Sequence, residues 1–184
     1  DPSLYTKKQL KVYFGKTSIL KAVSNNLIDE IQQEKIKQTK KFFSLNSKVV
    51  GESYKSKINK IRFILKSNKA DYLFISAPEN VAWILNIRGS DNPNSRIPNC
   101  RLIIGKNKEL FLIAQIDKAS KIVKEKKLSK KQVIDPKNFK DLINNLKGNK
   151  CVIDPASCSV LYKNIIKSKF QNINYGDPCY KLKS

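Results

Sequence analysis

Apolar residues follow two patterns along this chain. Some recur every three to four positions, as in helices, and others form short continuous runs, as in buried strands. The strongest helical rhythm begins after Ser53, where the apolar residues fall on one face: Tyr54, Ile58, Ile61 and Leu65. The lysines between them are expected on the outer face. A continuous apolar run then predicts a buried strand over residues 71–76, and Pro78 predicts the first turn of a second helix that carries Trp83.

The same patterns assign most of the remaining chain. Helices are predicted over 10–14, 117–126, 137–146 and 157–169, with a short helix or linker over 26–38. Strands are predicted over 18–23, 101–104, 110–113, 132–134, 151–153 and 172–174. Gly105-Lys106-Asn107-Lys108 predicts a β-hairpin. Residues 37–52 read as irregular. Alternating strands and helices with one hairpin predict the α/β class, with a mixed β-sheet flanked by helices.

Two distant segments share one pattern. Asp1-Pro2 precedes a helix and a short strand, and Asp154-Pro155 precedes another helix and strand. Asp accepts backbone hydrogen bonds at such a turn, and Pro fits the first helical turn. The pattern alone leaves two interpretations open, because Asp-Pro is common before helices and a duplicated domain produces the same echo.

The formal net charge is +22, from 37 basic and 15 acidic residues. Such a charge suits a partner with phosphate groups, such as nucleic acid or a membrane surface. Lysine supplies nearly all of it, however, and the arginines that serve bidentate phosphate recognition are few: Arg62, Arg88, Arg96 and Arg101. Because Lys, Asn and Ile are all abundant, AT-rich codon usage is the favoured explanation.

Other residue types narrow the chemistry. The chain has no histidine, and its cysteines lack the Cys-x-x-Cys spacing of a zinc site, so we expect buried free thiols: Cys100, Cys151, Cys158 and Cys179. Its longest apolar runs are far too short to span a bilayer. The chain opens Asp1-Pro2 without a signal-peptide pattern, and it contains no Met, which suggests a piece of a longer protein.

The densest polar cluster follows the Trp83 helix. Arg88 directly precedes a loop that runs from Gly89 to Pro98, and Ser90 and Asp91 lie within it; Gly89 permits a turn with positive φ. A structural alternative stays open, in which Arg88 and Asp91 pair with each other and cap neighbouring elements. Trp83 itself is more typical of a core residue than of a ligand platform. Asp154 and Asp177 each precede Pro, which indicates turn capping.

Residues 81–91, Val-Ala-Trp-Ile-Leu-Asn-Ile-Arg-Gly-Ser-Asp, resemble the second domain of three-domain Xaa-Pro aminopeptidases of the creatinase/prolidase superfamily. Residues 27–31 resemble the family's interdomain segment, and residues 50–53 resemble its bacterial branch. Pro93 and Pro98 match bacterial prolines. Arg96 and residues 99–101 depart from the pattern, which bears on how the loop packs beside the cleft.

The resemblance implies a creatinase/prolidase N-terminal domain-like fold. It also favours the duplication, with residues 1–26 as the C-terminal remnant of a preceding homologous domain and residues 27–184 as the second domain. The catalytic pita-bread domain, with its metal ligands, is absent from this chain. We therefore expect no catalytic residue, no metal ligand and no cofactor here, and the two divalent metal ions, often manganese, belong to the parent's catalytic domain.

The implied role is non-catalytic and cytoplasmic. The domain helps to wall the substrate cleft, with Arg88, Ser90 and Asp91 at the rim. Its partners would be its own C-terminal catalytic domain, peptide substrates with proline at the second position, and a second copy in a homodimer, with no membrane and no nucleic acid. Two alternatives stay open: a stand-alone basic nucleic-acid-binding module, and a degenerate non-enzymatic relative that acts as an interaction protein.

Overall fold

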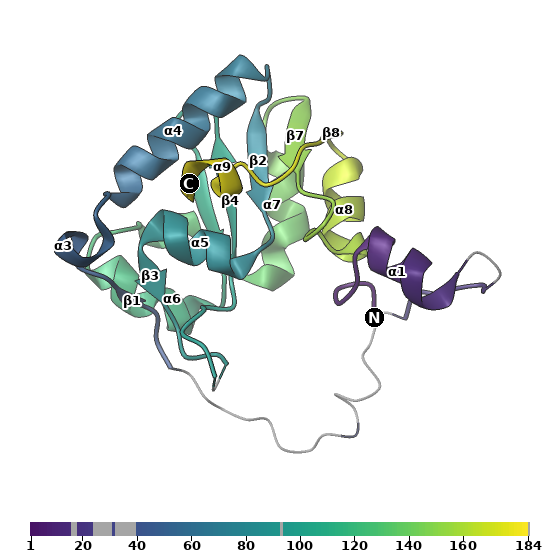
Figure 1. Ribbon diagram of the computed structural model, residues 1–184, viewed down its shortest axis with the longest axis horizontal. Helices are drawn as coiled ribbons and strands as arrows, with labels where there is room; N and C mark the ends of the chain where they lie inside the picture. The colour runs from purple at the N-terminus through teal and green to yellow at the C-terminus, as the bar shows by residue number, and fades with distance from the viewer. Residues whose placement is uncertain (16–17, 24–30, 32–39, 93, 184) are drawn as a thin grey trace.

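A computed structural model describes residues 1–15, 18–23, 31, 40–92 and 94–183. Within these residues a mixed β-sheet of six strands lies between two layers of helices (Figure 1). The strand order is β6-β5-β4-β2-β7-β8. The strands are β2 Tyr72–Ile75, β4 Arg101–Gly105, β5 Leu110–Ile113, β6 Val133–Ile134, β7 Lys150–Ile153 and β8 Gln171–Asn174.

The sheet is mixed because one hairpin interrupts a set of parallel pairs. β4 runs antiparallel to both β2 and β5, whereas β2 pairs in parallel with β7, β7 with β8, and β5 with β6. Gly105 N donates to Glu109 O at 2.9 Å and closes the predicted hairpin. The predicted α/β class and the mixed sheet flanked by helices are confirmed.

Four helices contribute buried residues to the core on one side of the sheet, and Figure 1 shows three of them, α4, α5 and α9, in front of the strands. The four are α4 Tyr54–Ser67, α5 Pro78–Leu85, α6 Ile116–Lys124 and α9 Cys179–Lys183. Ser53 caps α4 by accepting from Ser56 N at 3.2 Å, and Pro78 opens α5 as predicted. A small two-stranded sheet of β1 Phe43–Ser44 and β3 Ile87–Arg88 adjoins this layer.

The second face packs on α7 Phe139–Asn145 and α8 Val160–Lys167. Its centre is aromatic: Phe74 lies 5.3 Å from Phe139 and 5.4 Å from Tyr162, measured between ring centroids. Contacts of this kind stabilise a core beyond simple area burial. All four cysteines are buried and free, as expected from their spacing.

The N-terminal segment lies beside α8 (Figure 1). Its helix α1, Lys7–Phe14, begins with a capping box between Thr6 and Gln9. Val160 N donates to Tyr5 O at 2.9 Å, which ties the segment to the start of α8. The assignment of residues 1–26 to a preceding domain stays a prediction, and the boundary itself falls outside the described residues.

Several sequence predictions are wrong in detail. Residues 18–23 form no strand, so the first copy of the Asp-Pro pattern shows only its helix within the described part of the chain. The segment predicted as irregular contains β1 and a short helix α3, Ser47–Val50. The predicted 157–169 helix is shorter, because residues before Ser159 form a turn. The predicted helix over 26–38 lies almost entirely outside the described residues.

Candidate functional site

The loop between β3 and β4 lies at the end of the sheet where β2 finishes. Ile75, the last residue of β2, pairs with Leu102 near the start of β4, so the loop joins the sheet at that end. There it borders a hollow of about 350 Å³ whose walls include Pro78, Asp91 and Pro98. In open α/β sheets ligands bind beyond the carboxyl ends of parallel strands, which makes this end the natural place for a site.

Asp91 fastens the loop at two points. Its Oδ2 accepts from Asn99 N at 2.7 Å, and its Oδ1 accepts from Lys118 Nζ on α6. The two side chains of the ion pair are only 11% and 15% exposed, so water screens their attraction weakly. Asp91 thereby links the two ends of the loop to each other and to α6.

Arg88 and Ser90 have separate partners. The Nη1 group of Arg88 donates to Ile87 O at 2.9 Å and to Ala82 O at 3.4 Å, while Ser90 Oγ accepts from Arg96 Nη1 at 3.0 Å. Arg88 and Asp91 therefore do not pair with each other, since Asp91 pairs with Lys118, but each bonds a neighbouring element, as the structural alternative also held. All three predicted site residues are half-buried around one loop.

Gly89 is required for a reason other than the predicted one. Its φ is not positive; instead, a Cβ at this position would lie 2.7 Å from Pro98 Cα. The backbone strands of the loop cross closely here, and Gly89 N donates to Arg96 O at 2.9 Å. Any side chain would force them apart, because real Cβ contacts with backbone carbon are never this short.

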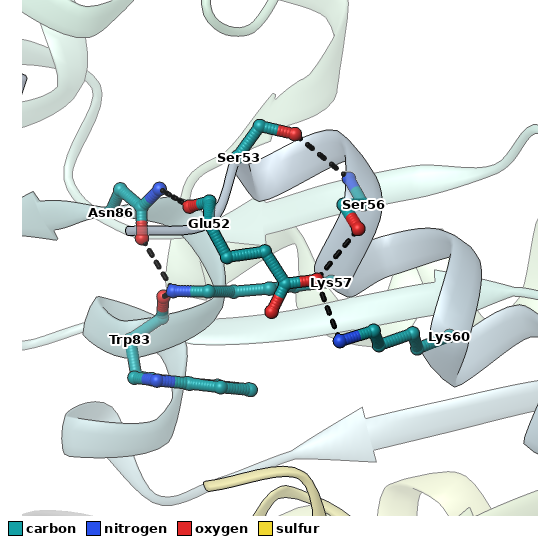
Figure 2. A network of polar contacts seen from close by, with 7 residues as sticks. All are labelled: Glu52, Ser53, Ser56, Lys57, Lys60, Trp83 and Asn86. Carbon is teal, nitrogen blue, oxygen red and sulfur yellow. Dashed lines mark hydrogen bonds and ion pairs between the residues drawn. The ribbon is translucent and has the colours of Figure 1, made fainter. Parts of the chain in front are cut away.

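The chain enters this loop through a polar network at the end of α5 (Figure 2). Asn86 ends the helix in the left-handed region, at φ 50° and ψ 47°, a conformation that Asn tolerates better than most residues. Lys57 of α4 points into this turn: its Nζ donates to Trp83 O at 2.8 Å and to Asn86 Oδ1 at 2.7 Å. The ammonium also lies 4.3 Å from the Trp83 ring centroid.

Lys57 is 2% exposed and is bound by neutral oxygens, not by a carboxylate. Burial lowers its pKa, and the charge of Glu52 offsets part of that effect. The C-terminal end of a helix carries partial negative charge, which suits a cation at this place. Lys127 adds a second one, donating to Leu85 O at 2.9 Å and to Asn86 O at 3.1 Å.

Glu52 adds further contacts to this network (Figure 2). Asn86 Nδ2 donates to Glu52 O at 2.8 Å, while the Glu52 carboxylate accepts from Ser56 Oγ at 2.6 Å and pairs with Lys60 at 2.9 Å. The hydrogen bond from Ser56, followed by that from Lys60, lowers the pKa of Glu52. The turn that precedes Arg88 is therefore held by Lys57 of α4 and by Glu52 just before α4.

Catalytic groups are not assembled in the described part of the chain. No group of three or more His, Cys, Asp or Glu side chains there could hold a metal ion, so these residues do not fit a dinuclear metal centre. Ser76 Oγ lies 2.8 Å from Ser157 Oγ, and Ser157 donates to Asp154, but a sequence without histidine supplies no imidazole base. Burial raises the pKa of Cys151 to about 12, so its thiolate is suppressed.

Other sequence predictions concern single residues. Asp154 accepts from Ala156 N and Asp177 from Cys179 N, so the predicted turn capping is confirmed for both. Trp83 packs against the core as predicted, and its ring also lies near the ammonium groups of Lys57 and Lys183. None of the described helices is long and apolar enough to span a membrane.

Sequence reasoning missed the lysines that build the site. Lys57 was expected on the outer face of its helix, and the structure corrects this. A signal was present, because Lys57 precedes Ile61 by four positions and therefore shares its apolar face. Lys118 carried the same signal, because it precedes the buried Ile122 of α6 by four positions, whereas Lys127 lies beyond the end of α6 and carried none.

With this geometry in view, the family is clear. The model for the Creatinase/Prolidase N-terminal domain matches residues 32–184, and the chain belongs to this family. The suspected resemblance is thereby confirmed. None of the relatives supports the alternative of a nucleic-acid-binding module.

Named relatives and solved structures are consistent with this family. The chain is 31% identical over 171 residues to Xaa-Pro aminopeptidase 1 of Dictyostelium discoideum, covering 81% of this chain and 25% of that protein. It is 33% identical over 98 residues to Xaa-Pro aminopeptidase ApepP of Drosophila melanogaster, covering 52% and 16%. The chain thus spans about a quarter or less of the length of these relatives.

A solved structure shares the fold at low identity. The X-prolyl aminopeptidase of Caenorhabditis elegans, described as a cytosolic enzyme with a di-nuclear active site, superposes with a TM-score of 0.71 at 20% identity. The superposition covers 91% of this chain and 28% of that one. A Xaa-Pro aminopeptidase of Streptococcus thermophilus superposes at 0.53 with 12% identity, covering 71% and 98%.

Proposed function

We propose that this chain is a non-catalytic N-terminal domain of a cytoplasmic, metal-dependent Xaa-Pro aminopeptidase, and that its β3–β4 loop forms part of the substrate-cleft wall. The family match and the fraction of each relative that the chain spans support this role. The substrate class is peptides with proline at the second position. The proposal also includes a homodimer and a covalently linked catalytic domain that holds two divalent metal ions, with manganese as the candidate.

The hydrogen bonds of Arg88 are the observation that supports a role for the loop in the cleft wall. Within the described part of the chain both hydrogen bonds of its guanidinium use Nη1, which leaves Nε and Nη2 for an acceptor outside this domain. A guanidinium held at one nitrogen is already oriented for a carboxylate or a peptide carbonyl. Ser90 and Asp91 hold the adjoining loop through Arg96 and Lys118, so that Arg88 keeps its position.

The test compares Arg88→Ala with Lys167→Ala, an exposed substitution on α8 at the other face of the sheet. In the full-length protein, Arg88→Ala should lower kcat/KM for an Xaa-Pro peptide by about tenfold, the effect of losing one charged hydrogen bond. Lys167→Ala should leave it unchanged. In the 184-residue chain, neither substitution should move Tm by more than about 2 °C.

Two results would contradict the proposal. One is a large fall in Tm of the Arg88→Ala chain with unchanged kcat/KM, which would make Arg88 a purely structural residue. The other is manganese-dependent Xaa-Pro hydrolysis by the 184-residue chain alone, because the domain is proposed to contribute no catalytic group. Both measurements use the same purified proteins.

A further inference from the structure

A second hollow, of about 350 Å³, lies between α4 and the β4–β5 hairpin, away from the β3–β4 loop. Four basic side chains from three parts of the chain contribute to its walls, together with two neutral amides. The basic residues are Lys55, Arg62, Lys108 and Lys127, and the amides are Asn59 and Gln132. We call this hollow the basic groove.

The cations of the basic groove have no ion-paired carboxylate in the part of the chain that the structure describes. The ion pairs there involve Lys60, Lys106 and Lys118. The charge of Glu109, beside Lys108, raises the pKa of Tyr72, which belongs to the core on the opposite face of the sheet. The Glu109 side chain is not among the residues that line the basic groove.

Arg62 is oriented for an anion. Its side chain is half-buried, and its Nε donates to Gly105 O at 3.4 Å, which fixes the guanidinium at the inner end. The terminal nitrogens of such a fork match two oxygens of one phosphate group. Asn59 and Gln132 supply neutral amide donors to the same walls.

Lys127 is the cation of the basic groove whose charged form a bound anion would stabilise. Its ammonium donates to two carbonyl oxygens and lies 5.4 Å from the Tyr54 ring centroid, so its bonded partners are neutral. Burial lowers its pKa, with the charge of Glu125 opposing and that of Lys57 adding to the effect. A bound anion would stabilise this charged form and relieve the repulsion among the four cations.

We propose that the basic groove binds a compact multivalent phosphate anion of the pyrophosphate type. Convergence of cations from α4, from the hairpin and from the segment after α6 distinguishes the basic groove from a diffuse lysine surface. Its volume suits a small anion or one terminal group of a larger phosphorylated molecule. This site does not rest on the role proposed for the β3–β4 loop, although Lys127 also bonds the turn that enters that loop.

The test is calorimetric titration of the 184-residue chain with pyrophosphate at about 150 mM salt, where diffuse surface attraction is largely screened. The variant Arg62→Gln with Lys108→Gln removes two charges of the basic groove. The matched control, Lys121→Gln with Lys124→Gln, removes two exposed charges on α6. We expect the basic-groove variant to weaken binding by about tenfold or more and the control by less than about twofold.

Further arms separate the sources of any signal. Arg62→Lys keeps the charge but removes the fork, and should recover only part of the affinity. Orthophosphate should bind more weakly than pyrophosphate, and a single-stranded DNA should lose equal affinity in both double variants. The proposal is overturned if wild-type chain shows no pyrophosphate binding at millimolar concentration, or if the control pair weakens it as much as the basic-groove pair. Unchanged Trp83 fluorescence verifies that each variant is folded.

Discussion

Two polar networks hold the β3–β4 loop in place. In one network lysines bond neutral oxygens, and in the other a lysine pairs with a carboxylate. The inner network consists of Lys57, Asn86 and Lys127 at the end of α5, where each ammonium is bound by neutral oxygens. The outer network consists of Asp91, Lys118 and Asn99, where an ammonium meets a carboxylate. The inner one fixes the backbone that enters the loop, and the outer one fastens the loop to α6.

The difference shows that a buried cation does not require an acidic partner. The end of α5 presents carbonyl oxygens with partial negative charge, and the Trp83 ring presents a polarisable face 4.3 Å from Lys57 Nζ. Removing Lys57 leaves the buried Asn86 Oδ1 without a donor and weakens the bonding of Trp83 O, whereas removing Lys118 leaves a carboxylate nearer the surface. We therefore expect the inner network to contribute more to stability than the outer one.

The largest effect should come from Lys57→Met. The substitution keeps most of the side-chain volume but leaves Asn86 Oδ1 unsatisfied, at about 1–3 kcal/mol for a buried group, and leaves Trp83 O with only the long bond from Asn86 N, at 3.4 Å. We expect the free energy of unfolding to fall by about 2–4 kcal/mol, measured by urea denaturation. Lys60→Met, on the exposed side of the same helix, should cost about 0.5 kcal/mol. Equal effects would show that burial of Lys57 is unimportant.

A somewhat smaller effect is expected at Asn86. Asn86→Ala loses the side-chain bonds to Lys57 and Glu52 and places Ala in the left-handed region, for a total of about 2–3 kcal/mol. Asn86→Gly loses the same bonds without the backbone strain and should be about 1 kcal/mol more stable than the Ala variant. If the two variants unfold at the same urea concentration, backbone strain at this turn is negligible.

The outer network should respond less. Asp91→Asn keeps an acceptor for Asn99 N but removes the charge that Lys118 meets, and we expect a loss of about 1–2 kcal/mol. The double variant Asp91→Asn with Lys118→Met should lose less than the sum of the single changes, because the two side chains interact directly. Additive losses in the same urea assay would contradict a coupled pair.

The sequence predicts the scaffold far better than it predicts these networks. Helical spacing from Tyr54 to Leu65 and the run at 71–76 are local signals, and both elements are confirmed. The loop itself was found, because Arg88, Ser90 and Asp91 lie within four positions of one another in a polar stretch. Strands β1 and β3 were missed, since two residues carry no periodicity.

The partners of the loop could not be predicted, because they come together only in the folded chain. Lys57 reaches Asn86 across 29 positions, and Lys118 reaches Asp91 across 27. Gly89 gives the same lesson: a sequence pattern suggested positive φ, whereas the glycine is required by the approach of Pro98. Lysine side chains are also usually exposed, so the burial of Lys57, which is 2% exposed, contradicts the usual expectation.

The smallest effect that separates the two networks is the pH dependence of Lys57. Burial, aided by the charges of Arg88, Lys60 and Lys183 and opposed by that of Glu52, lowers its pKa below the ordinary 10.5. Between the folded pKa and 10.5 the unfolded chain binds a proton that the native chain has released, so stability rises with pH there. Below both values Lys57 is protonated in both states and contributes no slope.

The sign of the Lys57 contribution can be isolated by comparing the stability of wild type with that of Lys57→Met at each pH. The raised pKa values of Tyr72 and of the buried cysteines lower stability at alkaline pH, but they do so equally in wild type and in Lys57→Met. The stability difference between the two proteins should therefore grow from pH 7 towards pH 10 (about the range of lysine titration). A Lys57 difference that shrinks with rising pH would mean that a favourable contact of the charged ammonium outweighs its desolvation.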